Sequence, residues 1–128
     1  MRCIVCILGK NLDVNKLSLR IGLENITIKY KGEKIGKRIR DYSSITLPIS
    51  KNEDFDLQEQ ISDAIRFLRE NKKRLEIVKS FPNIDFSTIN FGVHYQSKQD
   101  AVHGAYFPKE LVELCSILDL GIEISFYS

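Results

Sequence analysis

The chain has 128 residues, of which 43% are hydrophobic and 28% charged, and its formal net charge is only +2. These values are ordinary for one globular domain, residues 1–128, which is large enough to fold without a metal or a disulfide. They exclude a strongly basic or acidic protein. No apolar run approaches the roughly 20 residues of a membrane span and no signal peptide is evident, so we expect a cytoplasmic protein with no membrane partner.

The first part of the chain predicts a strand, a short helix and a second strand. Residues 3–8 are apolar on both faces, which is typical of a central strand. The spacing of apolar residues from Asp13 to Ile21 predicts a short amphipathic helix, and Gly22 suits its C-terminal cap. Residues 26–30 alternate apolar and polar side chains, which indicates a half-buried strand.

The middle of the chain predicts a strand and a long helix. The strand covers residues 44–49, where Pro48 favours an edge position or an early end because proline donates no hydrogen bond to the ladder. Asp56, with Glu59 three residues later, resembles a capping box at the start of the helix. Polar residues 71–73 interrupt its apolar stripe, which resumes either as a bent continuation or as a second short helix.

The last part of the chain again predicts a strand, a helix and a strand. The strand at residues 89–95 is followed by a polar loop at 96–104. Pro108 begins an amphipathic helix, and residues 122–127 form a terminal strand. The core face of this helix is expected to hold Leu111, Leu114, Cys115 and Leu118.

These elements predict an α+β fold. We expect a two-layer sandwich in which a mostly antiparallel sheet of about five strands carries helices on one face. The nearest named architecture is a ferredoxin-like duplication of two βαβ units, with an extra strand and helix between them.

The cysteines are interpreted as plain thiols of the core. Cys3 and Cys6 lie three positions apart within a predicted strand, so their side chains face opposite sides and cannot easily chelate one ion. Cys115 lies on the apolar face of the last helix. We therefore expect neither a disulfide nor a metal site.

No catalytic or cofactor-binding motif stands out. His94 falls in a predicted strand, and His103 stands near Asp100 in a polar loop with no nucleophile or metal ligand indicated beside it. The carboxylates of residues 53–56 are best explained by the start of the long helix, where negative charge is favourable. Neither a nucleophile-elbow serine nor a dinucleotide-binding glycine pattern is present. The sequence therefore predicts a protein that is not an enzyme and has no cofactor.

The segment from Lys29 to Arg40 is the most distinctive local feature, because it contains six basic residues and a single acidic one, Glu33. The remainder of the chain is net acidic, so the charge is asymmetric. Three interpretations stay open. The segment is a solvated loop or hairpin, a surface for an acidic protein partner, or a phosphate-contacting arm with Tyr30 and Tyr42 stacking on bases. The candidate partner-binding residues are Lys31, Lys34, Lys37, Arg38, Arg40 and, in the polar loop, His103.

Several stretches of the chain resemble a bacterial family, domain of unknown function four-two-seven-nine. Residues 7–13 resemble its strand followed by G-x-x-L-D, and residues 21–23 with 30–33 resemble its Gly and Lys-Gly-Glu stretches. Residues 107–127 are the most specific part, resembling its closing helix and Gly-started strand. The family usually carries a tryptophan in the strand after the Lys-Gly-Glu stretch, and this chain contains none.

The resemblance implies no known catalytic residues, and small stand-alone proteins of this type are similar to immunity proteins of bacterial toxin systems. We therefore expect a cytoplasmic protein that binds one protein partner, an immunity protein that neutralises a toxin domain. The alternatives are a nucleic-acid-binding module that uses the basic segment and a small-molecule sensor domain. The chain is expected to be a monomer or a homodimer.

Overall fold

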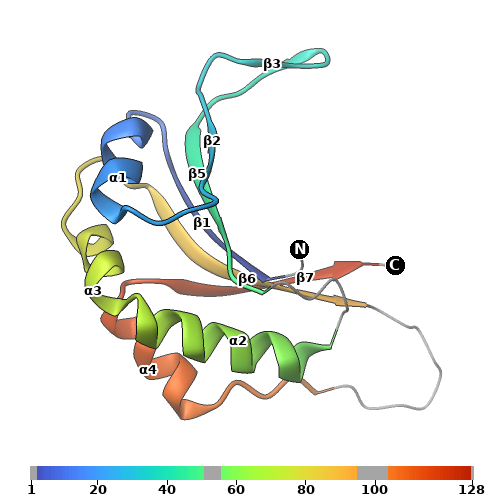
Figure 1. Cartoon of the computed structure of the whole chain (residues 1–128). Coiled ribbons are helices and arrows are strands. Elements are labelled where there is room, and N and C mark those ends of the chain that lie inside the picture. Colours follow the sequence, from blue (N-terminus) through green and yellow to red (C-terminus); the bar gives the residue numbers. More distant parts are fainter. Residues whose placement is uncertain (1–2, 51–55, 95–103, 128) are drawn as a thin grey trace.

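A computed structural model describes residues 3–50, 56–94 and 104–127 of the chain (Figure 1). These residues form a mixed five-stranded sheet, a separate two-stranded hairpin and four α-helices, so the predicted α+β class is confirmed. The elements are, in chain order, β1 (Cys3–Gly9), α1 (Val14–Ile21), β2 (Thr27–Lys29), β3 (Lys34–Ile35), β4 (Arg38–Ile39), β5 (Ser43–Pro48), α2 (Leu57–Glu70), α3 (Lys72–Leu75), the 3-10 helix η1 (Glu76–Lys79), β6 (Phe86–His94), α4 (Lys109–Ile117) and β7 (Gly121–Tyr127).

The strands of the large sheet lie in the order β2-β5-β1-β6-β7. β1 is antiparallel to β5 and to β6, β2 is antiparallel to β5, and β6 and β7 are parallel. The two strand–helix–strand units expected from the sequence therefore differ. β5 lies between β1 and β2, whereas β6 and β7 are direct neighbours joined through α4.

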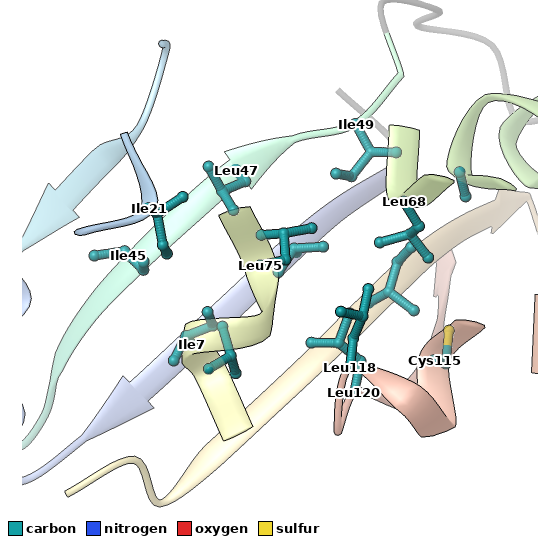
Figure 2. Packing of buried hydrophobic residues seen from close by; sticks show 14 of the residues in the cluster. Ile7, Ile21, Ile45, Leu47, Ile49, Leu68, Leu75, Cys115, Leu118 and Leu120 are labelled. Atoms are coloured by element: carbon teal, nitrogen blue, oxygen red, sulfur yellow. The ribbon is translucent and has the colours of Figure 1, made fainter. Parts of the chain in front are cut away.

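One face of the sheet carries the core. In β1, Val5 and Ile7 are fully buried, while Ile4 and Cys6 on the other face are only half-buried. Figure 1 shows the helices against one side of the sheet, and in Figure 2 side chains from strands and helices converge in one cluster. The expected core face of the last helix is confirmed, since its four residues are all buried: Leu111, Leu114, Cys115 and Leu118.

The helix ends follow the signals read from the sequence. Asp13 caps α1 by accepting a hydrogen bond from Lys16 N, and Gly22 ends it in the left-handed conformation. Asp56 caps α2 in the same way, accepting from the backbone N–H groups of Gln58 and Glu59. After α2 the chain continues as α3 and η1, so the apolar stripe resumes in a second short helix.

The edge position that Pro48 suggested for its strand is wrong, whereas the early end is confirmed. β5 lies between β2 and β1, and Pro48 is its last residue. Ile49 N donates to Cys3 O, so the nitrogen of Pro48, one residue earlier, points away from β1. β2 pairs only as far as Thr46, so proline occupies a position where no ladder bond is required.

The described helices include none that is long and apolar enough to cross a membrane. Cys3, Cys6 and Cys115 are free thiols. Cys3 points into the core and Cys6 to the opposite face of β1, as the spacing predicted.

Candidate functional site

The basic segment forms an arm, defined here as residues 30–42, which extends beyond the end of the large sheet (Figure 1). Its outer part, called the tip below, is the hairpin of β3 and β4, residues 34–39. In this hairpin Lys34 pairs with Ile39 and Ile35 with Arg38. Gly36 has a φ of 59° at the first central position of the two-residue turn. A type II′ hairpin turn favours glycine at that position because it requires positive φ.

A bulge at Gly32 connects the arm to the sheet. Gly32 has a φ of 91°, and Glu33 N donates to Tyr30 O at 3.3 Å, as in a type II turn. Gly32 N donates to Arg40 O at 2.8 Å while Arg40 N donates to Glu33 O at 2.9 Å. Gly32 and Glu33 thus lie opposite the single residue Arg40. This arrangement is a β-bulge with glycine at its first position. A bulge bends its strand, and this bend accounts for the outward course of the hairpin.

Hydrogen bonds to the domain fix the base of the arm. Tyr30 Oη donates to Asn15 Oδ1 of α1 at 2.7 Å, and Lys31 N donates to Ser43 Oγ at 2.9 Å. Tyr30 N donates to Glu33 Oε1 at 3.0 Å. The acid of the segment is therefore held at the base, and its negative charge does not lie among the cations of the tip.

The structure brings five of the six predicted binding residues onto this one arm. Four of them, Lys31, Lys34, Lys37 and Arg38, are exposed. Arg40 is half-buried, and its Nε atom is buried without a hydrogen-bond partner among the described residues. Arg40 therefore belongs to the base of the arm, as Lys31 does, and the tip carries three exposed cations: Lys34, Lys37 and Arg38.

Two isoleucines of the tip were missed by the sequence analysis. Ile35 is 48% exposed and Ile39 is 63% exposed. Cross-strand partners share a face of a hairpin, so one face presents Lys34 beside Ile39 and the other presents Ile35 beside Arg38. The signal that could have indicated their exposure was the short length of the hairpin. Strands of two residues each cannot form a core that buries the isoleucines.

A shallow pocket of about 380 Å³ lies beside the base of the arm. It is lined by Lys10, Lys31, Asp41 and Tyr42. Lys10 Nζ lies 5.7 Å from the centroid of the Tyr42 ring, a cation–π distance. The pocket extends the positive surface of the arm onto the end of β1.

Those of the remaining candidate residues that the structure describes lie away from the arm. His94 is an exposed residue at the end of β6. His103, Asp100 and the carboxylates of residues 53 and 54 lie outside the described residues. Within residues 3–50, 56–94 and 104–127, no group of three or more His, Cys, Asp or Glu side chains is placed to hold a metal ion.

A polar group on the helix-free face of the sheet was also missed. Asn90 is 9% exposed and donates through Nδ2 to Ser125 Oγ at 2.9 Å and to the Glu123 carboxylate. Burial raises the pKa of the nearby Cys6 thiol and Glu123 adds to the rise, while a hydrogen bond from Thr46 opposes it. A thiol with a raised pKa is a poor nucleophile at neutral pH, so this group satisfies polar atoms and offers no activated sulfur.

Comparison with protein-family models, with curated proteins and with solved structures gave no match for this chain. The family resemblance noted in the sequence therefore stays a prediction.

Proposed function

We propose that this protein is a non-enzymatic binding protein whose arm docks onto an acidic surface of one protein partner. The observation that carries the proposal is the composition of the tip, where exposed cations stand beside Ile35 and Ile39 while Glu33 is held at the base. Charged groups steer the approach of a partner, and burial of the isoleucines at the contact removes apolar surface from water, which favours association.

The exposed isoleucines favour a protein partner over a nucleic acid. Apolar side chains next to arginine are typical of protein interfaces, whereas phosphate recognition needs only cations and hydrogen-bond donors. The nucleic-acid alternative needs the rings of Tyr30 and Tyr42 to stack on nucleotides, but both rings lie where the arm joins the domain. Tyr30 donates its hydroxyl hydrogen to Asn15, and Tyr42 lies beneath Lys10.

For the fold, we propose a two-layer, ferredoxin-like core. The chain order β1-α1-β2-β5-α2-β6 follows the β-α-β-β-α-β order of that architecture, with α4 and β7 added at its C-terminal end. The arm is then an insertion in the connection between the two middle strands. Insertions on a rigid scaffold are common carriers of binding function, which supports the role of the arm.

Among single-partner functions, we propose immunity, in which this protein neutralises a bacterial toxin domain in the cytoplasm. The support is the resemblance of residues 7–13 and 107–127 to a family similar to immunity proteins. This role is tested by producing a toxin-like protein from a neighbouring gene in cells, with and without this chain. The toxin-like protein alone should inhibit growth, and co-production of this chain should restore it. Growth inhibition that persists at equal production levels argues against immunity but leaves the binding role of the arm intact.

The binding role is tested by reversing charge at the tip. Native protein, a variant with Lys34, Lys37 and Arg38 changed to Glu, and a control variant are immobilised to capture the partner from a lysate of producing cells. The control carries the same charge change on helices, at three exposed lysines: Lys16, Lys73 and Lys79. The captured protein is then purified, and its association rate with each variant is measured over a range of salt concentrations.

The tip variant should associate about tenfold or more slowly than native protein at low salt, with a flatter salt dependence, because charges at an interface rim act mainly on the association rate. The control variant should stay close to native. Equal rates for the tip and control variants exclude the arm as the docking surface. Steep, sequence-independent binding to duplex DNA or RNA that the tip variant loses favours the nucleic-acid alternative. A melting shift with a small molecule favours the sensor alternative.

A further inference from the structure

The two edges of the large sheet are built differently. β2, at one edge, has three residues and runs into the bulge at Gly32, and short length and bulges are devices that keep an edge from pairing. β7, at the other edge, has seven residues in an unbroken register with β6. It contains no proline and no basic residue, and its only charge is Glu123. Among the described residues no strand lies beyond it.

The hydrogen bonds of β6 determine which backbone N–H and C=O groups of β7 point away from the sheet. The N–H and C=O of Gly92 are both bonded to the Gln60 side chain, so they do not point at β7. Backbone groups alternate sides along a strand, so residues an odd number of positions from Gly92, such as Ile89, direct their N–H and C=O groups toward β7. In a parallel pair, a residue that faces the other strand forms hydrogen bonds with the residues before and after its partner. The partner of Ile89 is Ile122, so Ile89 bonds the two neighbours of Ile122. The peptide groups of Ile122 and Ile124 thus point away from the sheet.

Apolar side chains accompany this edge. Phe126 of β7 is 67% exposed, and Val112 of α4 is 47% exposed. Glu110 of α4 forms an ion pair with Arg69 of α2, and Val112 lies about 200° further around the helix. Val112 is therefore turned away from α2, toward the side of α4 that overlies the edge of the sheet.

We propose that β7 pairs with β7 of a second copy of this chain, in antiparallel orientation about a two-fold axis at Ile124. This register places Ile122 opposite Phe126 of the second copy and Glu123 opposite Ser125, so apolar groups meet apolar groups and no like charges are opposed. An axis at Glu123 is disfavoured because it sets the two carboxylates directly against each other. The contact is self-complementary, as a two-fold interface requires.

The dimer joins the two five-stranded sheets at their β7 edges. The arms arise at the opposite edge of each sheet, next to β2 and β5, and stay accessible. Each dimer therefore presents two arms at its far ends. This inference does not depend on the function of the arm, and the two are tested separately.

Site-directed cross-linking tests the register. In a Cys6→Ser background, where Cys3 and Cys115 are buried, Ile124→Cys places two thiols on the two-fold axis. Directly opposed residues of an antiparallel pair have Cα atoms about 4.5–5.5 Å apart, a separation that a disulfide spans. The full chain should then form a disulfide-linked dimer on mild oxidation, whereas Leu19→Cys on α1, which is 83% exposed, should not.

Sedimentation analysis of the native chain tests the dimer itself. The native mass should be twice that of the chain, and Phe126→Lys should raise the dimer dissociation constant by about tenfold or more, because lysine on an edge strand opposes pairing. Leu19→Lys, a change at an even more exposed position on α1, should leave the dissociation constant unchanged. A native monomer at the highest soluble concentration overturns the proposal. A dimer that neither Phe126→Lys weakens nor Ile124→Cys cross-links uses another surface and overturns it as well.

Discussion

Gln60 of α2 and Gly92 of β6 are joined by a reciprocal pair of hydrogen bonds. Gln60 Nε2 donates to Gly92 O at 2.8 Å, and Gly92 N donates to Gln60 Oε1 at 3.1 Å. Gln60 is completely buried, and its side-chain amide takes the place of a neighbouring strand at this position of β6. The contact fixes the start of α2 against the sheet, so a polar side chain here is part of the core.

Changing Gln60 to Ala should lower the free energy of unfolding by about 2–4 kcal/mol, because both backbone groups of Gly92 lose their partner in a buried place. Denaturant titration measures the change. Gln58→Ala, on the exposed side of the same helix, serves as the control and should differ from native by less than about 0.5 kcal/mol. Equal stability of the two variants contradicts a structural role for the Gln60–Gly92 pair.

Gly9 should not tolerate any side chain. A Cβ atom at this position lies 2.0 Å from Asn83 O, which is a backbone atom and cannot move without shifting the chain. Gly9→Ala should therefore cost at least about 2 kcal/mol of unfolding free energy. Gly104→Ala, where no heavy atom lies within 4 Å of the added Cβ, is the matched control and should be nearly neutral. Equal thermal melting of the two variants argues against the close approach of β1 to Asn83.

The local elements could be predicted because their signals are local. Asp13, Gly22 and Asp56 mark helix ends through hydrogen bonds and φ angles that involve only nearby residues. The central place of β5 could not be predicted. It depends on which neighbouring strand each N–H group faces. Pro48 alone does not reveal that its nitrogen points to the side of β2, which no longer pairs with β5 at that position. The contact of Gly9 with Asn83 is equally non-local.

The candidate site could be predicted in charge but not in shape. The excess of lysine and arginine is visible in the sequence, and Gly32 and Gly36 mark the turns. The outward course of the arm depends on the bulge at Gly32, which needs the backbone of Arg40 as its partner. The exposure of Ile35 and Ile39 depends on the same course, because isoleucines on a strand are normally expected in the core.

The face of α4 that meets the sheet should account for a large share of the stability. Leu114→Ala should lower the free energy of unfolding by about 2–5 kcal/mol, as large-to-small changes in a core do. Leu19→Ala on α1 is the control, since Leu19 is 83% exposed and its loss should cost less than about 0.5 kcal/mol. Denaturant unfolding that places Leu114→Ala within the range of this control shows that α4 faces water.

The buried thiols should make the protein less stable at alkaline pH. Burial raises the pKa of Cys115 from its ordinary value of 9.0 to about 11, and burial, with Asp63 and Cys115 nearby, also raises the pKa of Cys3. Above pH 9 the unfolded chain therefore releases thiol protons that the folded chain retains. The free energy of unfolding falls as the pH rises from the unfolded pKa toward the folded one, and this contribution is fully present only below the unfolded pKa.

Denaturant titrations from about pH 8 to about pH 10.5 measure this decline, a range that spans the ordinary pKa of a thiol. Tyrosine and lysine also ionise in the upper part of the range, so the comparison with Cys115→Ala isolates the thiol. The variant starts from a lower stability because it leaves a small cavity, but its decline with pH should be shallower than that of the native chain. Since a buried thiol is also shielded from reagents, alkylation of Cys3 and Cys115 at pH 9 should require unfolding. Parallel pH curves for the two proteins, or rapid alkylation of Cys115 in the folded state, contradict the burial of this thiol beneath α4.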